Sequence, residues 1–333
     1  MSTIAVLGAG AWGTALAVEL ARGGHRVTLC ARRGDHAAAI RAERENAAYL
    51  PGVALPESIE IGDRWAEAAG ASETVLMAVP SRFARVAMTP VGPALAGATL
   101  VSVTKGIEED SLCTMTAMLA EVAPAVARIA VLSGPAFAAE VARGRPAAVV
   151  AAARDEAAAR DVQRLFASRR LRIYRSVDVS GVELAGAAKN VIAIAAGISD
   201  GLGLGSSARA ALVTRGLAEL TRLGVRAGAR AETIYGLAGL GDLVLTCTGD
   251  LSRNRALGLR LGRGEGIDAV MAGMSSGHPV AEGVANARSI SRLAERMGVE
   301  MPIASAVCRV LYEGAPAHAM VDELLSRELK AEF

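Results

Sequence analysis

The 333-residue sequence predicts an α/β fold, with an N-terminal Rossmann-type doubly wound sheet over residues 1–177 and an all-helical C-terminal domain over residues 178–333. Two observations predict this division. In the first half, short apolar runs alternate with helical segments, which is typical of a mostly parallel sheet. From about Val177 the strand-like runs stop, and segments of helical length follow one another.

A glycine turn joins the first expected strand, residues 4–7, to the first expected helix, residues 14–21, in the segment IAVLGAGAWGTALA. Gly8 permits a tight turn, Gly10 lets the backbone approach a pyrophosphate, and Gly13 lets the helix pack closely on the strand. The N–H groups at the start of the helix then favour an anion. Taken alone, the pattern also fits an ordinary glycine-rich turn of an α/β protein.

Further apolar runs extend the expected sheet, at residues 26–30, 74–79, 100–104, 129–133 and 147–151. Helical segments lie between them, for example at 35–46 and 110–122, and residues 151–159 suit a solvated helix. Two of the strands end at Pro80-Ser81 and at Lys105-Gly106. These ends are expected at the carboxyl edge of the sheet, beside the glycine turn, where ligands bind in such folds.

The second half contains six segments of helical length, at 182–198, 208–222, 231–237, 253–261, 281–297 and 303–313. No internal repeat, low-complexity segment or long linker interrupts them. We therefore expect one all-helical domain.

Composition excludes several classes of protein. Hydrophobic residues make up 52% of the chain, and a net charge of +2 from 36 basic and 34 acidic residues gives no nucleic-acid-binding footprint. The four cysteines are scattered without metal-ligand spacing, as in a reducing compartment. We find no signal peptide, and no uninterrupted apolar run approaches the ~20 residues of a membrane span. We expect a soluble, cytoplasmic protein without a metal site or an integral membrane segment.

The bend after the second expected strand bears on the choice of nucleotide. The NAD-binding version of this fold carries an acid about 20 residues after the glycines. Residues 27–30 lead instead into Ala31-Arg32-Arg33-Gly34-Asp35, and the two guanidinium groups suit a 2′-phosphate. We therefore predict that NADPH is preferred, with NADH as a second cofactor. The alternative is a solvated loop in which Asp35 reaches the ribose.

A series of motifs makes the chain resemble a known family. In order they are GAGAWGTALA at 8–17, VPS at 79–81, TKGIE at 104–108, SGPAFAAEVARGRPAA at 133–148, GAAKNVIAIAAGISDGLGLGSSARAALVTRGLAE at 186–219, GLGDLVLTC at 239–247, SRNRALG at 252–258 and VAEGVANA at 280–287. From end to end they resemble the bacterial NAD(P)-dependent sn-glycerol-3-phosphate dehydrogenases. The resemblance implies a homodimer that interconverts dihydroxyacetone phosphate and glycerol 3-phosphate for phospholipid synthesis.

Reduction of a ketone needs a hydride donor, a group that polarises the carbonyl, and a proton for the alkoxide. Lys189 lies in an apolar helical segment, where burial and a nearby cation lower the pKa of a lysine, and Lys105 is the candidate for that cation. The resemblance implies that Lys189 is the general acid/base, that Lys105 contacts substrate and cofactor, and that Asp242 lies at the substrate. The alternatives are a Lys189 that extends to the surface and an Asp242 that caps a short helix.

The segment Ser252-Arg253-Asn254 resembles the start of a helix, which with a guanidinium and an amide suits a phosphate. The resemblance implies that these residues hold the substrate phosphate and that Arg253 also touches the cofactor. An ordinary capped basic helix is the alternative. Asn190 either donates to the substrate or fixes its helix locally. The remaining contacts implied are Gly134 and Ala136 for the substrate, and Ala11, Trp12, Tyr49, Ala138, Val280 and Glu282 for the cofactor.

For three of these residues a structural role is the alternative: core packing for Trp12 and Tyr49, and an exposed cap for Glu282. Two residues depart from the family pattern. Ala136 stands where the family usually has a serine or threonine whose hydroxyl binds substrate, so backbone or water replaces it or the substrate binds more weakly. Ala11 stands where many members have a serine, which backbone N–H groups can replace.

Two other functions compete with this reading of the sequence. One is a two-domain reductase of a β-hydroxy acid or sugar acid, but a carboxylate substrate needs no clamp such as Arg253. The other is a non-catalytic nucleotide sensor, which would have no need of Lys105, Lys189 and Asp242 together.

Overall fold

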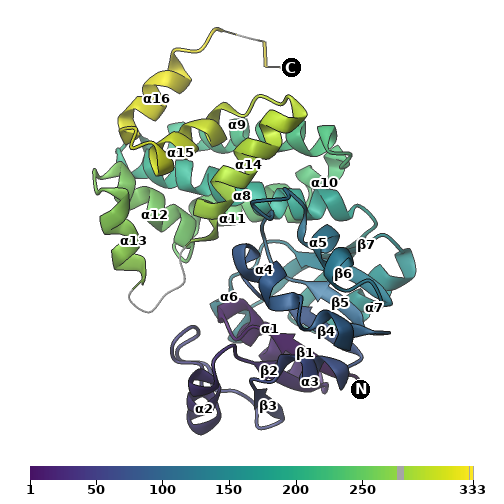
Figure 1. The fold of residues 1–333 in the computed structure, drawn as a ribbon. Helices are drawn as coiled ribbons and strands as arrows, with labels where there is room; N and C mark the ends of the chain where they lie inside the picture. Colours follow the sequence, from purple (N-terminus) through teal and green to yellow (C-terminus); the bar gives the residue numbers. More distant parts are fainter. Residues whose placement is uncertain (276–280, 330, 333) are drawn as a thin grey trace.

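Eight strands form one sheet in the N-terminal half, in the order β3-β2-β1-β4-β5-β6-β7-β8 (Figure 1). The structure is a computed structural model that describes residues 1–275, 281–329 and 331–332. Neighbouring strands are parallel except β6 and β7. The strands are β1 (Thr3–Leu7), β2 (Arg26–Cys30), β3 (Ile59–Gly62), β4 (Thr74–Met77), β5 (Thr99–Ser102), β6 (Arg128–Ser133), β7 (Ala147–Ala153) and β8 (Leu171–Ser176). The expected doubly wound sheet is confirmed.

Helices cover both faces of this sheet. They are α1 (Ala11–Arg22), α2 (Gly34–Glu43), α3 (Trp65–Gly70), α4 (Ser81–Met88), the 3₁₀ turn η1 (Gly92–Leu95), α5 (Met115–Val122), α6 (Ala138–Ala142) and α7 (Glu156–Phe166). Alternate residues of a strand point to opposite faces. In β1, Ile4 and Val6 therefore pack with α1, α6 and α7, whereas Ala5 and Leu7 pack with α3, α4 and α5. Burial on both faces explains why the strands are continuous apolar runs.

The strand order reverses between β1 and β4. Strands β2 and β3 lie beyond β1 on one side, and β5 to β8 lie beyond β4 on the other. In a doubly wound sheet, this is where a crevice opens at the carboxyl ends of the strands. The glycine turn follows β1, and Lys105 follows β5. Neighbouring strands lie about 4.8 Å apart, so two such spacings separate β1 from β5 along this edge.

Two strands of the sheet were not predicted, and two helices begin later than expected. β3 has only four residues, and β8 alternates buried residues with exposed Arg172 and Tyr174, so neither forms an apolar run. The solvated helix expected at 151–159 is wrong for its first residues, because they complete β7; α7 begins only after the Asp155 side chain accepts the N–H groups of Ala157 and Ala158. Likewise residues 110–114 are not helical, and the Thr114 side chain caps α5.

The second half is helical, as expected. Its elements are α8 (Val179–Gly201), α9 (Gly205–Arg226), α10 (Ala231–Tyr235), the π-helical turn η2 (Leu237–Gly241), α11 (Asp242–Thr248), α12 (Arg253–Gly262), α13 (Ile267–Ser275), α14 (Glu282–Met297), α15 (Pro302–Tyr312) and α16 (Ala317–Leu325). We propose the domain boundary at residues 177/178, because β8 ends at Ser176 and α8 begins at Val179.

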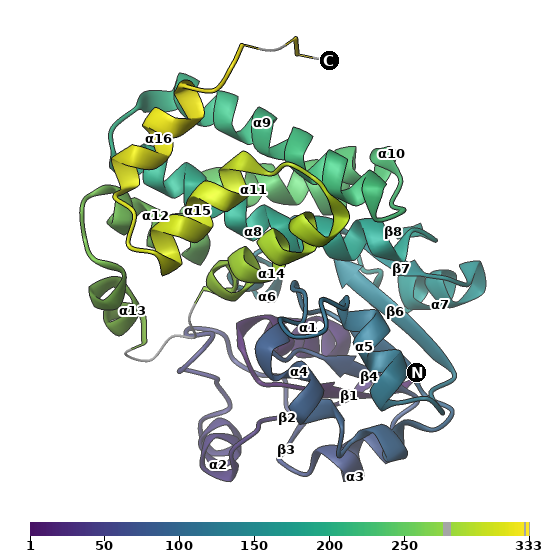
Figure 2. The ribbon, with the colours of Figure 1, turned by 45° about the horizontal axis from the view of Figure 1, so that its top comes forward.

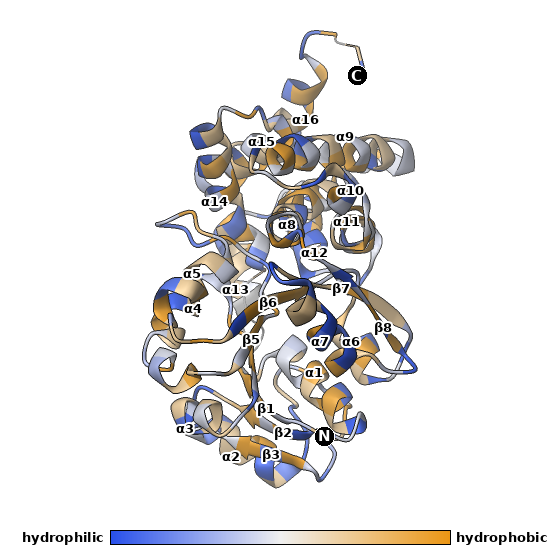
Figure 3. Ribbon diagram, turned by 90° about the vertical axis from the view of Figure 1, so that its right-hand side faces the viewer, coloured by the Kyte–Doolittle hydropathy of each residue, from blue (hydrophilic) through white to orange (hydrophobic). Residues whose placement is uncertain are grey.

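Helix α8 is the central element of this half, and Figure 3 looks nearly along its axis. It contacts α9, α11, α12, α14 and α15. Within the described part of the chain, α8 alone is long and apolar enough to cross a membrane, although the sequence analysis identified no such run, and its apolar window is wholly buried inside the protein. The length and hydropathy of α8 therefore reflect a core helix, in which Lys189 is embedded.

Glycines let α8 and α12 cross at close range. A Cβ at Gly258 of α12 would lie 2.0 Å from the carbonyl oxygen of Ile194 in α8, and a Cβ at Gly197 of α8 would lie 2.1 Å from that of Arg255 in α12. Backbone rather than a flexible side chain occupies both places. The crossing therefore fixes the first turn of α12, with Ser252 and Asn254, against the helix that carries Lys189.

We predict that Gly258→Ala lowers the free energy of unfolding by about 1–3 kcal/mol, because the added methyl group forces the two backbones apart. Urea unfolding followed by circular dichroism measures the change. Gly266→Ala is the matched control, since a Cβ at Gly266 would meet nothing within 4 Å. Equal stabilities for the two variants would contradict the prediction.

Candidate active site

The glycine turn after β1 has the geometry of an anion cradle. Gly8 has φ +117°, and a Cβ there would lie 2.4 Å from the carbonyl oxygen of Ala78. A Cβ at Gly13 would lie 2.1 Å from the carbonyl oxygen of Gly8, whereas one at Gly10 would meet nothing within 4 Å. Space beside Gly10 is therefore open, and α1 begins at Ala11 without a side-chain cap, which leaves its first N–H groups for an anion. These features fit the pyrophosphate of a dinucleotide.

Asn46, which the sequence analysis did not identify, supports this turn. Its side chain is almost completely buried and donates to the carbonyl oxygen of Ala9 at 2.9 Å and to Oγ1 of Thr14 at 2.8 Å. His36 lies 3.0 Å from the amide oxygen of Asn46. No sequence signal predicts this contact, because 37 residues separate Asn46 from Ala9. Trp12, on the first turn of α1, is partly buried, and its indole N–H has no partner among the described residues.

The residues that are predicted to contact the nucleotide end of the cofactor come after β2, farther along the carboxyl edge of the sheet. Arg32 and Arg33 are exposed just before α2, and Arg33 pairs with Asp35 at 3.1 Å. Tyr49 is 36% exposed, so it is not a core aromatic, and its ring lies 5.2 Å from that of His36. An open surface with two guanidinium groups is therefore present, but Asp35 is held by Arg33.

Two lysines from different halves of the protein share one carboxylate. Lys189 Nζ of α8 donates to Asp242 Oδ1 at 2.6 Å, and Lys105 Nζ from the end of β5 donates to Asp242 Oδ2 at 2.6 Å. Asp242 is 1% exposed and Lys189 is 5% exposed. Lys189 therefore does not reach the surface, and the carboxylate of Asp242 binds the ammonium groups rather than capping α11, whose N-cap is Gly241.

The turn η2 and helix α11 present this carboxylate. A π-helical turn at the site shifts the register of the following helix, a feature that recurs at functional sites. Thr246, one turn along α11, accepts a hydrogen bond from Lys189 at 2.6 Å and donates to the Asp242 carbonyl oxygen at 2.6 Å. Thr246 is a further site residue that was not predicted from the sequence.

Electrostatics set the proton affinity of Lys189. Burial lowers its pKa most, the charge of Asp242 raises it, and the charge of Lys105 lowers it, so that the pKa of Lys189 is about 8. An amine with this pKa is protonated at neutral pH and can still release its proton, which suits a general acid. Among the described residues, no group of three or more histidine, cysteine, aspartate or glutamate side chains could hold a metal ion.

The loop after β6 closes one side of the lysine cluster. Lys105 Nζ donates to the carbonyl oxygen of Gly134 at 3.0 Å, and Gly134 has φ +146°. A Cβ at Gly134 would lie 2.9 Å from the Cα of Val149, so glycine is required there. Ala136 packs against the core of the sheet domain, and Ala138 is the first residue of α6. Ala136 presents no hydroxyl.

The start of α12 lies beside Asn190. Asn254 donates to the Asn190 side chain at 2.9 Å and accepts from the Gly283 N–H at 3.0 Å, while the Ser252 side chain caps the helix by accepting from the Arg255 N–H. Arg255 pairs with the half-buried Asp200 at the end of α8, which fixes this turn further. Arg253, between the two buried residues, is exposed.

Glu282 lies among the cations of the site. It is partly buried at the start of α14 rather than an exposed cap, and burial raises its pKa. The cations that oppose this rise are Arg253, Lys105, Lys189 and Arg82. Glu282 thus interacts electrostatically with residues that are predicted to bind the substrate and the cofactor. Val280, which is also predicted to contact the cofactor, lies outside the described residues.

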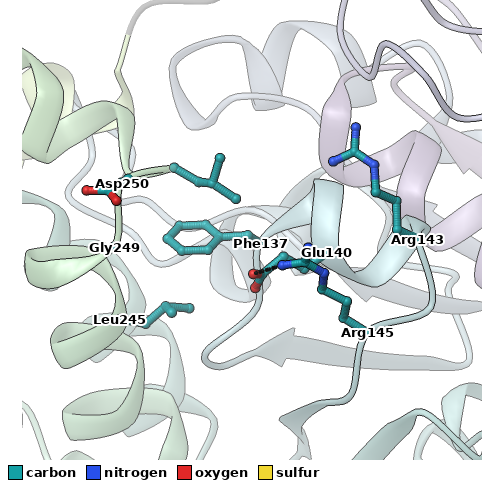
Figure 4. A pocket seen from close by; sticks show the side chains of 8 residues that line it. Phe137, Glu140, Arg143, Arg145, Leu245, Gly249 and Asp250 are labelled. Atoms are coloured by element: carbon teal, nitrogen blue, oxygen red, sulfur yellow. Dashed lines mark hydrogen bonds and ion pairs between the residues drawn. The ribbon is translucent and has the colours of Figure 1, made fainter.

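A pocket of about 430 Å³ adjoins this site without including the lysines. Phe137 and Glu140 line it from the sheet domain, and Leu245 and Gly249 from the helical domain (Figure 4). Phe137, next to Ala138, and Leu251, next to Ser252, are among its lining residues. The pocket therefore marks the outer rim of the junction between the two halves.

Comparisons with known proteins agree along the whole chain. The family model described as NAD-dependent glycerol-3-phosphate dehydrogenase N-terminus matches residues 3–159, and the C-terminal model matches residues 178–322. A protein of Geobacter sulfurreducens named glycerol-3-phosphate dehydrogenase (NAD(P)+) is 52% identical over 99% of this chain and 98% of that protein. One of the same name from Thiobacillus denitrificans is 50% identical over 99% of each chain. The crystal structure of a glycerol-3-phosphate dehydrogenase from Coxiella burnetii is 40% identical, with a TM-score of 0.93 over 98% of this chain and 99% of that one.

Proposed function

The chain belongs to the NAD-dependent glycerol-3-phosphate dehydrogenase family, and we propose that it interconverts dihydroxyacetone phosphate and sn-glycerol 3-phosphate with a nicotinamide cofactor. The observation that carries this proposal is the sharing of Asp242 by Lys105 and Lys189, at the same sheet edge as the glycine turn. This arrangement supports a proton source and a second cation that act together beside the bound cofactor.

The residues of the glycine turn would hold the cofactor pyrophosphate through the N–H groups of α1, with Trp12, Tyr49, Ala138, Arg253, Val280 and Glu282 along its length. The bound nicotinamide supplies a hydride for the carbonyl carbon. We infer that the Lys189 ammonium donates its proton to the alkoxide oxygen as it develops, because Lys189 is a buried amine with a pKa of about 8. Asp242 orients this ammonium, and Lys105 adds positive charge beside the oxygen.

The substrate phosphate would bind at the start of α12. Ser252 and Asn254 are buried there, Arg253 supplies a guanidinium, and Asn190 contacts Asn254 across the α8–α12 crossing. The positive end of the helix dipole and the guanidinium both favour a dianion. A carboxylate substrate carries less charge to match this clamp, which favours the phosphate ester over a β-hydroxy acid. With Ala136 in place of a hydroxyl, backbone Gly134 is the remaining substrate contact of that loop.

An absorbance assay at 340 nm of NADPH or NADH oxidation with dihydroxyacetone phosphate tests this function. We expect turnover that depends on dihydroxyacetone phosphate and is much slower with unphosphorylated dihydroxyacetone. Inactivity with dihydroxyacetone phosphate but turnover of a β-keto acid would select the other reductase class. No turnover of any ketone, with the cofactor bound, would favour a nucleotide sensor.

We further propose that NADPH is preferred over NADH, supported by the exposed Arg32 and Arg33 after β2. Arg32→Gln with Arg33→Gln is expected to lower kcat/KM for NADPH by about tenfold or more and to change that for NADH little, because two charge-assisted contacts to a 2′-phosphate are lost. The same assay with each cofactor measures the ratio. Arg41→Gln on α2 is a control for the loss of a nearby guanidinium, and it removes one positive charge where the double variant removes two. Equal losses with both cofactors would remove the 2′-phosphate argument.

We also propose that the protein is a cytoplasmic homodimer whose product supplies glycerophospholipid synthesis. The family resemblance supports this proposal. Sedimentation equilibrium tests the oligomeric state.

A further inference from the structure

Three side chains of α14 bind the backbone of the segment that carries Lys105. Asn286 Nδ2 donates to the carbonyl oxygen of Lys105 at 3.0 Å, and Ser289 Oγ donates to that of Ile107 at 3.3 Å. One turn further, an Arg292 guanidinium nitrogen donates to the carbonyl oxygen of Glu109 at 2.6 Å. Helix α14 belongs to the helical half, and in Figure 2 it lies where that half meets α4 and α5 of the sheet half. The Lys105 segment is therefore held by the opposite domain.

Part of the spacing of these contacts follows from helix and strand geometry. Residues three apart lie on one face of a helix, and residues two apart in an extended chain point their carbonyl oxygens to one side, as for Lys105 and Ile107, whereas Glu109 lies in the turn that follows. Asn286, Ser289 and Arg292 are three apart, and Lys105, Ile107 and Glu109 are two apart. On the other side, the Glu108 carboxylate forms a bidentate pair with Arg85 of α4, with both distances 2.7 Å. The segment thus lies between two helices that are contributed by different domains.

Asn286 is the contact nearest to the lysine cluster. It is completely buried, and its amide nitrogen donates also to the carbonyl oxygen of Ala187 in α8 at 3.2 Å. A carbonyl oxygen can accept a hydrogen bond from the NH₂ end of the Asn286 amide but not from its oxygen end. Because the amide contacts two carbonyl oxygens, its orientation is fixed. Ala187 is two residues before Lys189. One side chain therefore ties the backbone of Lys105 to the helix of Lys189.

Side chains of α4 and α14 approach the segment closely at Gly106. A Cβ at Gly106 would lie 2.4 Å from Oγ of Ser81 in α4 and 3.0 Å from Oδ1 of Asn286. The chain passes between α4 and α14 at this glycine. Loss of the Asn286 donors would free the segment on the α14 side only, and Lys105 would then move relative to Asp242.

We propose that Asn286 is a positioning residue for Lys105, holding its ammonium against Asp242 through the two backbone carbonyls; this rests on the proposed function, in which Lys105 acts at the substrate. Ser289 and Arg292 extend the same contact along α14. Nothing in the proposed chemistry touches Asn286 itself. Its loss is therefore expected to act through the backbone that it holds, chiefly that of Lys105.

The first experiment compares Asn286→Leu with the wild type. Leucine has a similar volume but donates no hydrogen bond, so kcat with dihydroxyacetone phosphate is expected to fall about 10- to 100-fold through misplacement of Lys105. The Kd of NADPH, measured by fluorescence titration, is expected to stay within about twofold, because the glycine turn is untouched. Ser291→Ala, which removes a hydroxyl beside Cys308 from the same helix, is the matched control and keeps the wild-type kcat.

A double-mutant cycle separates positioning from general destabilisation. In a Lys105→Met background, Asn286→Leu is expected to change kcat less than about twofold, since the residue it positions is gone. Arg292→Met, at an exposed end of the contact, provides a second variant that leaves the core intact and is expected to lower kcat by a smaller factor that also vanishes in Lys105→Met.

Different outcomes overturn different statements. A wild-type kcat for Asn286→Leu, or the same loss with and without Lys105, overturns the positioning role. A wild-type protein that does not reduce dihydroxyacetone phosphate instead overturns the proposed function. Should Asn286→Leu fail to fold, additive losses for Arg292→Met and Lys105→Met would overturn the positioning role.

Discussion

Lys189→Ala is expected to lower kcat for dihydroxyacetone phosphate reduction by about 10³-fold, within the range that a positioned general acid contributes. The Kd of NADPH is expected to stay nearly unchanged, because the cradle around Gly8 and Gly10 is formed by other residues. Stopped-flow or steady-state NADPH oxidation measures kcat, and fluorescence titration measures the Kd. The variant removes the buried amine without altering the sheet domain.

Lys189→Met distinguishes the loss of the ammonium from the loss of packing, since methionine fills the place of the lysine stem. Both variants should lose the same factor in kcat. If Lys189→Met retains activity near the wild type, the proton comes from another group and Lys189 serves the packing of α8. A rate for Lys189→Ala within about tenfold of the wild type would lead to the same conclusion.

Asp242→Asn is expected to lower kcat at neutral pH by about 10²-fold, through the charge of Lys189. The Asp242 carboxylate raises the pKa of Lys189, while burial and Lys105 lower it to about 8. Without the carboxylate the pKa falls further, so less ammonium is present at neutral pH. The amide also leaves the buried Lys189 ammonium beside that of the partly buried Lys105 without a carboxylate between them, which costs stability.

The pH profile of kcat tests the predicted direction of the shift in the Lys189 pKa. In the wild type the rate of ketone reduction should fall as pH rises through about 8, and the rate of alcohol oxidation should rise there, because Lys189 is the acid in one direction and the base in the other. In Asp242→Asn both limbs should move to lower pH. The charged and titratable groups that act on Lys189 are Asp242, Lys105, Cys247 and Glu282.

An unchanged limb in Asp242→Asn would show that another group titrates in the profile. Asp250→Asn supplies the control, since this carboxylate is exposed in the pocket rim and pairs with Arg255 rather than with a lysine of the cluster. Its profile should match that of the wild type. A shift in both variants would indicate a general effect of charge rather than the contact between Asp242 and Lys189.

The sequence alone determined the fold class and the cofactor turn. Strands buried on both faces are continuous apolar runs, Gly8 is required by its positive φ in the turn, and Gly13 is required by contact with the Gly8 carbonyl oxygen, so these signals are local. The helical second half was equally visible, since each helix carries its own apolar periodicity. The edge strand β8 was not, because one of its faces is solvated and it carries Arg172 and Arg175.

Only the tertiary structure decided how the chemistry is assembled. Lys105 and Asp242 are 137 residues apart, and Asn286 and Lys105 are 181 apart, so no local pattern reports their contact. Asn46 and Thr246 were missed for a related reason: a polar side chain shows its role only through the buried partner that it satisfies. The residues of the site can be named from sequence, whereas their shared carboxylate, the pKa of Lys189 and the contact with α14 arise from packing two domains together.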